Sequence, residues 1–219
     1  MNEAFELVVF DWDGTLMDSP ARIVASMVAA TADVGQKVLP EEDYRDVIGL
    51  GIWEAMTRLF PAADQATLDH FIARYRHYFL EACTTEAPLF DGVHELLQAV
   101  GGAGALLAVA TGKSRAGLDR VLVETGCGHY FHATRTADET RSKPDPQMLL
   151  EIIEELDVAP DKVLMVGDTE YDLEMAARAG TSAVAVSFGA HIPQRLAAYE
   201  PLACVDSLAQ LQAFLVTRL

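Results

Sequence analysis

Apolar runs alternate with amphipathic stretches along most of this chain. Short, nearly continuous apolar runs lie at residues 5–10, 105–110, 162–166 and 182–187. Stretches with the apolar spacing of a helix lie at residues 93–100, 115–125, 146–156 and 171–179. Apolar strands that alternate with helices are typical of a parallel sheet covered on both faces. The pattern therefore predicts an α/β fold with a Rossmann-like parallel sheet core.

One long segment breaks this alternation. Between about Met17 and about Thr85 the spacing predicts consecutive helices and no strand; the expected helices are residues 21–34, 41–47, 52–60 and 66–83. A helical insertion after the first strand is the simplest explanation. We therefore expect an α/β core domain made of residues 1–16 and 86–219, and an inserted all-helical cap domain made of residues 17–85. Pro88 and the pair Asp91-Gly92 supply turn residues where the chain would return to the core.

The net charge limits the classes of partner. The chain has 219 residues and a formal net charge of −17, from 33 acidic and 16 basic residues. A surface this negative repels nucleic acid and anionic membranes. The expected partner is therefore a small molecule, and an anionic one would need local positive groups or a metal ion. We expect the protein to act as a monomer or homodimer.

The cysteines and the first residues indicate a cytoplasmic protein. Cys83, Cys127 and Cys204 are an odd number at wide spacing, which indicates neither a disulfide framework nor a zinc site. A turn followed by a short strand is the favoured interpretation of residues 127–132. The N-terminal residues carry acids where a signal peptide would carry positive charge.

Two carboxylates follow the first apolar run, in the sequence VVFDWDGTL. Successive side chains of a strand point to opposite faces, so Asp11 and Asp13 should project to one side and Trp12 to the other. Like charges at this spacing repel each other and raise each other's proton affinity. The pair therefore indicates a bound cation, a shared proton or a role in a reaction.

Further polar residues follow the other strands. Thr111 and Gly112 come after the second apolar run, Asp168 comes after the third, and Asp172 stands four residues later. Lys143 lies in a loop before the helix expected from residue 146. Ligands of open parallel sheets bind beyond the carboxyl ends of the strands, so we expect these groups to meet at one edge.

This set of residues suits phosphoryl transfer. A carboxylate such as Asp11 can attack phosphorus and form an aspartyl-phosphate. Mg²⁺, which prefers oxygen ligands, would bridge Asp11, Asp168 and the phosphate. Lys143 would hold the phosphoryl group as a point charge, and Thr111 would donate a hydrogen bond to it. Asp13 is placed to protonate the leaving oxygen and then to deprotonate the attacking water.

Four motifs in this order, DWDGTL, ATGKS, SKPDP and GDTEYD, resemble those of the haloacid dehalogenase superfamily, and the chain looks like its phosphoglycolate phosphatase type with a small helical cap. The resemblance implies Asp11 as nucleophile and Asp13 as general acid and base. It also implies Mg²⁺ held by the Asp11 side chain, the Asp13 backbone carbonyl and Asp168. Thr111 and Lys143 would bind the phosphoryl group, and Asp172 would orient the lysine or a water on the metal. We count Gly112 with the substrate-binding residues.

Two glycines of the insert are candidates for substrate binding. Gly49 and Gly51 precede a helix expected from Ile52, and free amides at a helix start favour anions. They would hold a substrate carboxylate, as phosphoglycolate requires. A plain glycine turn between cap helices explains the same residues equally well.

Several functions share this scaffold. The leading hypothesis is a Mg²⁺-dependent phosphatase acting on a small phosphorylated metabolite such as 2-phosphoglycolate. A sugar phosphomutase, which passes the aspartyl-phosphate to another hydroxyl, is the alternative. A halide-releasing dehalogenase has no use for Asp13 or Mg²⁺. A phospho-accepting signalling module is the alternative from another class, although such modules usually lack the Asp13 position and a helical insert.

Overall fold

A six-stranded parallel sheet forms the centre of the computed structural model, which describes residues 4–219. The strand order is β3-β2-β1-β4-β5-β6, and every neighbouring pair is parallel. The strands are β1 (Leu7–Phe10), β2 (Leu106–Thr111), β3 (Ala133–Thr136), β4 (Val163–Gly167), β5 (Ser182–Val186) and β6 (Cys204–Val205). The first strand is central, between β2 and β4, so its carboxyl end lies in the middle of the sheet edge.

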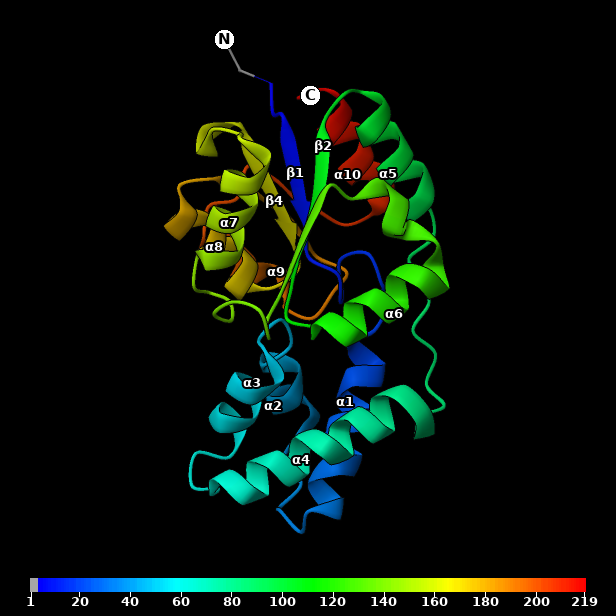
Figure 1. The fold of residues 1–219 in the computed structure, drawn as a ribbon, viewed down its shortest axis with the longest axis vertical. Helices are drawn as coiled ribbons and strands as arrows, with labels where there is room; N and C mark the ends of the chain where they lie inside the picture. The colour runs from blue at the N-terminus through cyan, green and yellow to red at the C-terminus, as the bar shows by residue number, and fades with distance from the viewer. Residues whose placement is uncertain (1–3) are drawn as a thin grey trace.

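Helices cover both faces of the sheet, as the strand pattern predicts (Figure 1). Leu7 and Val9 face one apolar cluster, built with α7 (Gln147–Leu156) and α8 (Glu170–Ala179). Val8 and Phe10 face the other, built with α5 (Val93–Gly102), α6 (Arg115–Thr125) and α10 (Leu208–Val216). Because β1 is buried on both sides, its sequence is apolar at every position. The predicted α/β fold is confirmed.

The segment between β1 and α5 is helical and contains no strand. Its helices are α1 (Pro20–Asp33), α2 (Glu41–Asp46), α3 (Ile52–Leu59), α4 (Gln65–His77) and the π-helix η1 (Tyr78–Ala82). They form a separate apolar cluster around buried residues such as Tyr44, Met56 and Phe71. Figure 1 shows this helical unit beyond the ends of β1 and β2. It therefore faces the edge where ligands of parallel sheets bind.

The two chain segments that join the helical unit to the sheet pair with each other. The Asp18 amide donates to the Pro88 carbonyl at 2.8 Å, and the Phe90 amide donates to the Leu16 carbonyl at 3.0 Å. An isolated antiparallel bridge joins Met17 and Leu89 between them. The chain thus enters and leaves the helical unit at one place.

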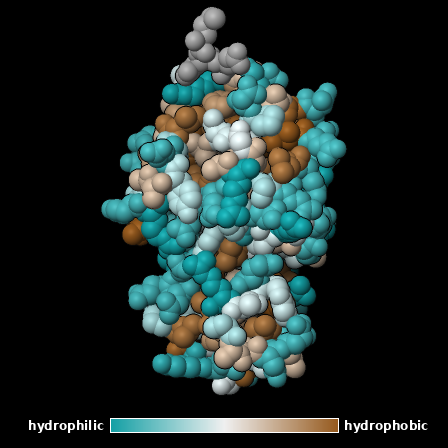
Figure 2. Space-filling view, turned by 90° about the vertical axis from the view of Figure 1, so that its left-hand side faces the viewer, coloured by the Kyte–Doolittle hydropathy of each residue, from teal (hydrophilic) through white to brown (hydrophobic). Residues whose placement is uncertain are grey.

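Three further short elements connect the strands and helices of the sheet domain. They are the 3₁₀ helices η2 (Cys127–Tyr130) and η3 (Pro160–Lys162), and α9 (Pro193–Ala197). The turn and short strand expected at residues 127–132 and beyond are present as η2 and β3. The sequence analysis did not predict β6, α9 or α10. Among the described residues no helix is long and apolar enough to cross a membrane, and hydrophilic side chains predominate on the face shown in Figure 2.

Candidate active site

The two carboxylates after β1 differ from the tryptophan between them. The Asp11 amide donates to the Val166 carbonyl at 2.9 Å, which continues the ladder beyond β1. Trp12 is fully buried in the apolar cluster that contains α5 and α10. Asp11 and Asp13 instead line a cavity at the sheet edge. The alternation expected from the sequence is therefore present.

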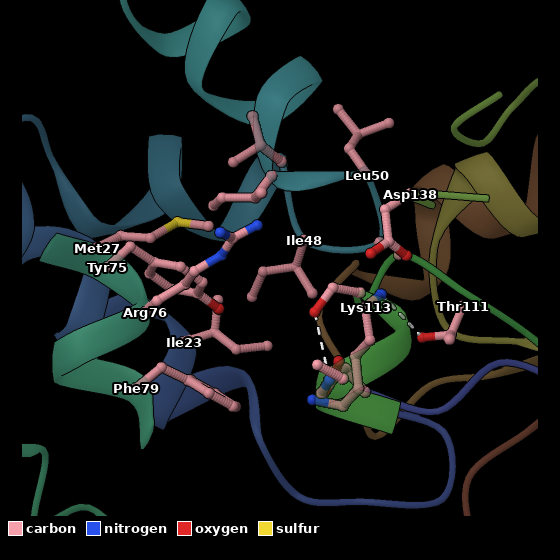
Figure 3. Close-up of a pocket in the computed structure, with 18 of the residues that line it drawn as sticks. Ile23, Met27, Ile48, Leu50, Tyr75, Arg76, Phe79, Thr111, Lys113 and Asp138 are labelled. Carbon is pink, nitrogen blue, oxygen red and sulfur yellow. Dashed lines mark hydrogen bonds and ion pairs between the residues drawn. The ribbon is translucent and has the colours of Figure 1, made fainter. Parts of the chain in front are cut away.

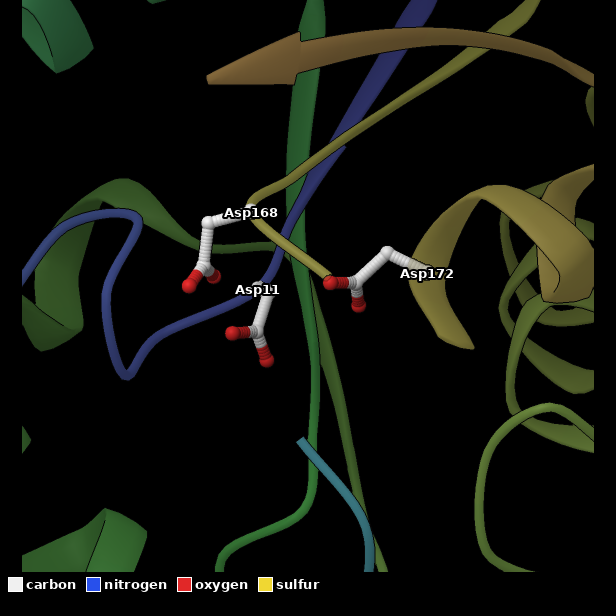
Figure 4. A group of neighbouring side chains, drawn as sticks. All are labelled: Asp11, Asp168 and Asp172. Atoms are coloured by element: carbon white, nitrogen blue, oxygen red, sulfur yellow. The ribbon is translucent and has the colours of Figure 1, made fainter. Parts of the chain in front are cut away.

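Three buried acids meet at this edge. Asp11, Asp168 and Asp172 each place one carboxylate oxygen so that the three atoms lie within 4.8 Å of one another. Figure 4 shows Asp11 and Asp168 following β1 and β4, with Asp172 reaching in from α8. All three side chains are almost completely inaccessible to solvent. The structure thus brings Asp11 together with two acids that lie about 160 positions later in the sequence.

Lys143 is the cation inside this cluster. Its Nζ donates to Asp11 Oδ1 at 2.5 Å and to Asp172 Oδ1 at 2.6 Å, and its side chain has no exposed area. Burial alone would disfavour the charged amine, but the two carboxylates outweigh burial and raise the pKa of Lys143 above its ordinary value. Lys143 therefore stays protonated and fixes one oxygen of Asp11.

Local hydrogen bonds orient the carboxylates of the other two acids, Asp172 and Asp168. Thr169 and Asp172 form a capping box at the start of α8, in which Asp172 Oδ2 accepts from the Thr169 amide and hydroxyl. The other oxygen, Oδ1, is left for Lys143. Asp168 accepts from the Thr15 hydroxyl at 2.9 Å and from the Ala190 amide at 2.6 Å. Neither Thr15 nor Ala190 was expected at the site from the sequence.

Glycines allow the backbone to approach these acids closely. A Cβ atom at Gly14, whose φ is +83°, would lie 2.2 Å from Asp168 Oδ2, and one at Gly189 would lie equally close to the same atom. Real Cβ contacts are never this short. Gly14 belongs to the DWDGTL motif, whereas no sequence signal marked Gly189.

The acids fit a divalent cation. Asp11 Oδ2 is buried and has no hydrogen-bond partner among the described residues. Three buried carboxylates face one buried ammonium group, which leaves an excess of negative charge. Burial, together with repulsion from neighbouring acids, raises the pKa of Asp11 and raises that of Asp168 to about 7. An oxygen-only donor set with excess negative charge is the kind that Mg²⁺ prefers.

We expect Mg²⁺ to stabilise the folded protein, more strongly at high pH. The pKa of Asp168 is higher in the folded than in the unfolded protein, so without the ion its contribution to stability is lost as pH rises from about 4 to about 7. That loss approaches about 1.4 kcal/mol per pH unit per group. Mg²⁺ at 100 times its dissociation constant adds about 2.7 kcal/mol to the free energy of unfolding. Urea unfolding at pH 5.5 and pH 8, with Mg²⁺ or a chelator, measures both effects.

A matched pair of variants tests where the ion binds. Asp168→Asn should remove the Mg²⁺ effect and raise the stability of the metal-free protein at pH 8, because one buried charge is gone. Asp206→Asn, which changes an exposed acid, should leave both quantities unchanged. Equal Mg²⁺ stabilisation of wild type and Asp168→Asn would contradict this assignment.

Asp13 has partners of its own. Its Oδ1 accepts from the Ser19 hydroxyl at 2.5 Å and forms an ion pair with Lys113 Nζ at 2.9 Å. The Ser19 side chain therefore does not cap α1, although Ser19 stands at the N-cap position of that helix. Asp13 Oδ2 has no hydrogen bond with any described residue. Lys113 stands in the ATGKS motif, yet the sequence analysis assigned it no role.

Thr111 lines the cavity, and its hydroxyl accepts from the Lys113 amide at 3.2 Å. Ser114 rather than Thr111 caps the following helix α6, since its side chain accepts from the Gly117 amide. The Thr111 hydroxyl proton is therefore available to a ligand. Gly112 lies against the helical unit: a Cβ there would be 2.6 Å from the carbonyl oxygens of Gly49 and Leu50.

The two candidate glycines of the helical unit differ in what they offer. Gly49 lines the cavity and Gly51 directly precedes α3, as expected. The Gly51 amide already donates to the Ser142 hydroxyl at 2.7 Å. This contact joins the helical unit to the loop that carries Lys143. In this conformation the Gly51 amide is therefore not open to a substrate carboxylate.

The cavity lies between the helical unit and the sheet edge and has a volume of about 420 Å³. Asp11, Asp13 and Thr111 line it from the sheet. Figure 3 shows side chains of α1, α4 and the residue 47–52 segment facing Thr111 and Lys113 across it. The fold and the site together define a class of α/β proteins that hold a ligand between a parallel sheet and a helical insert.

Comparisons with known proteins agree with this architecture. The sequence pattern of haloacid dehalogenase-like hydrolases matches residues 8–186. "Probable phosphatase IndB" of Dickeya dadantii is 35% identical over 93% of this chain and 90% of its own length. A phosphoglycolate phosphatase of Vibrio vulnificus is 30% identical over 95% of both chains.

Two solved structures have the same fold. A haloacid dehalogenase-like hydrolase from Bacteroides fragilis, described as putative, has a TM-score of 0.87 and 26% identity, covering 94% of this chain and 99% of its own. A "putative beta-phosphoglucomutase" from Thermotoga maritima has a TM-score of 0.75 and 26% identity, covering 98% of this chain and 100% of its own. The chain therefore belongs to the haloacid dehalogenase-like hydrolase family, and the resemblance drawn from its four motifs is confirmed.

Proposed function

We propose that this protein is a Mg²⁺-dependent phosphatase that hydrolyses a small phosphorylated metabolite through a phosphate ester of Asp11. The observation that carries the proposal is the state of the Asp11 carboxylate. Lys143 holds its Oδ1, while Oδ2 is buried without a partner. A carboxylate fixed through one oxygen and free at the other is placed for attack on phosphorus.

The first half of the reaction uses Asp11 and Asp13. Asp11 Oδ2 forms a bond to phosphorus while the bond from phosphorus to the ester oxygen breaks. Asp13 in its acid form gives a proton to the departing oxygen, and we assign this proton to Oδ2 because Ser19 and Lys113 occupy Oδ1. Lys143 and the Thr111 hydroxyl bind the phosphoryl oxygens as charge develops on them.

The second half regenerates the enzyme. Asp13, now a carboxylate, takes a proton from a water molecule that attacks phosphorus. The bond between phosphorus and Asp11 breaks, and inorganic phosphate is released. Asp172 touches no substrate in this scheme, since both of its oxygens bind Lys143 and Thr169. Its role is to position the lysine.

The metal ion would be held by Asp11 and Asp168, with the Asp13 carbonyl as the third ligand that the family resemblance implies. When bound, Mg²⁺ neutralises charge between the acids and the phosphate. We further propose that residues 17–85 act as a cap domain over a core of residues 1–16 and 86–219. A cytoplasmic location belongs to the same proposal and agrees with the three unpaired cysteines.

Steady phosphate release tests this function. With Mg²⁺ and 4-nitrophenyl phosphate, we expect many turnovers per enzyme, no requirement for a sugar bisphosphate, and loss of activity on chelation. The similarity to the "putative beta-phosphoglucomutase" from Thermotoga maritima is the reason to test a mutase as the second candidate. It predicts instead that a bisphosphate is required and that phosphate moves between two hydroxyls of a sugar. A single turnover that stops at a phosphorylated protein would indicate a signalling module.

Phosphoglycolate is the reference substrate, because several relatives are named phosphoglycolate phosphatase. Other relatives are named for different phosphates, such as N-acetylmuramic acid 6-phosphate in Pseudomonas aeruginosa. The family therefore supports the reaction class, and the choice of leaving group depends on the walls of this chain's own cavity.

A further inference from the structure

The cavity is much larger than a two-carbon leaving group requires. Its volume of about 420 Å³ falls in the range of about 300–1,000 Å³ that is typical of pockets for drug-sized ligands. The phosphoryl group would lie at one end, against Asp11 and Thr111. A glycolate group would fill only a small part of the remaining space, so its partners would be mostly water.

The walls around this space are apolar on the side of the helical unit. The residues that face it are Ile23, Met27, Ile48, Leu50, Tyr75 and Phe79 (Figure 3). An apolar wall stabilises a bound ligand only when it removes apolar ligand surface from water. A charged two-carbon acid offers almost no such surface.

Two of these side chains form an aromatic platform. The rings of Tyr75 and Phe79 are stacked, with centroids 5.7 Å apart and an angle of 27° between the planes. The Tyr75 hydroxyl makes no hydrogen bond with any described residue. Burial and the charge of Asp13 raise the pKa of Tyr75, so the hydroxyl keeps its proton.

One cation of the cavity wall has no partner. Lys113 pairs with Asp13, and Arg120 pairs with Glu124 at 2.7 Å. Arg76 lines the same cavity but forms no ion pair or hydrogen bond within residues 4–219. Figure 3 shows its guanidinium group beside Met27 and Ile48, well apart from Thr111. In a chain with a net charge of −17, an unpaired arginine here leaves a place for an anion away from the phosphate end.

We propose that the substrate is a phosphate monoester whose leaving group is an apolar, ring-sized body with a second anionic group on the side away from the phosphate. The ring packs against the stacked Tyr75 and Phe79 side chains, and the anion pairs with Arg76. This inference rests on the proposed phosphatase function and deepens it, because it names the class of leaving group.

Esters of primary alcohols test the size of the leaving group without changing its intrinsic reactivity. We expect kcat/KM with Mg²⁺ to be at least about 100-fold higher for 2-phenylethyl phosphate than for ethyl phosphate or 2-phosphoglycolate, because the ring buries apolar surface. Equal or lower values for 2-phenylethyl phosphate would overturn the inference and leave the phosphatase function standing. No phosphate release from any ester would instead refute the function on which it rests.

Two tyrosines on neighbouring turns provide a matched pair of variants. Tyr75→Leu should lower kcat/KM for 2-phenylethyl phosphate about tenfold and change that for ethyl phosphate less than twofold. Tyr78 does not line the cavity, and its hydroxyl donates to Asp33 at 2.9 Å. Tyr78→Leu should therefore leave the ratio of the two substrates unchanged. The same change of ratio in both variants would overturn the platform.

Two arginines provide the corresponding pair for the anion. A carboxylate added to the ring of 2-phenylethyl phosphate, at the meta or para position, should raise kcat/KM about three- to fivefold at low salt. Arg76→Gln should abolish this gain. Arg74→Gln should keep it, because Arg74 pairs with Asp33 at 2.6 Å and does not line the cavity. A gain that survives in Arg76→Gln, or no gain in wild type, would overturn the anion contact.

Discussion

Replacing Asp11 with asparagine is expected to lower kcat for phosphate release by at least about 10³-fold, because an amide cannot form the phosphate ester. The fold should persist. The pKa of Asp11 is raised by burial and by the neighbouring acids, which means that its charge is unfavourable in the metal-free protein. The unfolding midpoint of Asp11→Asn without metal should therefore equal or exceed that of wild type. Initial rates with 4-nitrophenyl phosphate and urea unfolding measure both quantities.

Asp13→Asn is the informative comparison for this variant. It keeps the nucleophile but removes the group that exchanges protons with the leaving oxygen and the water. We expect kcat to fall by about 10²–10⁴-fold. After rapid quenching, phosphate should be found on the protein in Asp13→Asn and never in Asp11→Asn. Wild-type rates in either variant would contradict the assigned roles.

Replacing Lys143 with methionine is expected to have the largest effect on stability. The change leaves Asp11 and Asp172 buried without their cation, and removing one partner of a buried ion pair costs about 3–5 kcal/mol. The loss should grow as pH rises, because burial raises the pKa of Asp11 and its protonation relieves the loss at low pH. Urea unfolding of the metal-free protein between pH 5.5 and pH 8 measures this dependence.

A second substitution separates lost charge pairing from lost packing. Lys143→Met combined with Asp172→Asn should recover a large part of the stability at pH 8, since one of the unpaired charges is removed. Activity should stay low in the double variant, because Lys143 also binds the phosphoryl group in the proposed mechanism. A double variant no more stable than Lys143→Met would show that packing, rather than charge, dominates at this position.

The sequence predicted the central strands and the convergence of the main side chains, because both depend on short local patterns. An apolar run buried on both faces identifies β1, and the positions directly after β1, β2 and β4 must meet at one edge. The same logic correctly placed Trp12 opposite Asp11 and Asp13. These inferences needed no knowledge of how the helical unit packs.

The contacts that were missed join segments that are distant in sequence and lack a periodic signal. Lys113 follows β2 and pairs with Asp13, which follows the neighbouring strand β1, and its ammonium also lies 4.7 Å from the centroid of the Phe79 ring in η1. The Ala190 amide binds Asp168 from the loop after β5, and a backbone donor leaves no mark on residue type. The strand β6 spans only Cys204–Val205, which is too short to show alternation.

The Gly51 amide shows how tertiary contacts change a local expectation. An exposed amide before a helix would attract an anion, but Ser142, from the loop that carries Lys143, accepts its hydrogen bond. The sequence identifies the donor and cannot identify which acceptor reaches it.

The paired segments around Met17 and Leu89 have an evolutionary consequence. Because the chain leaves the sheet and returns at a single hydrogen-bonded crossing, a change in the length of the segment between those two points need not separate β1 from β2. The whole helical unit could therefore be exchanged, lengthened or shortened during evolution. New specificities would then arise by swapping one contiguous stretch of gene while the chemistry at the sheet stayed untouched.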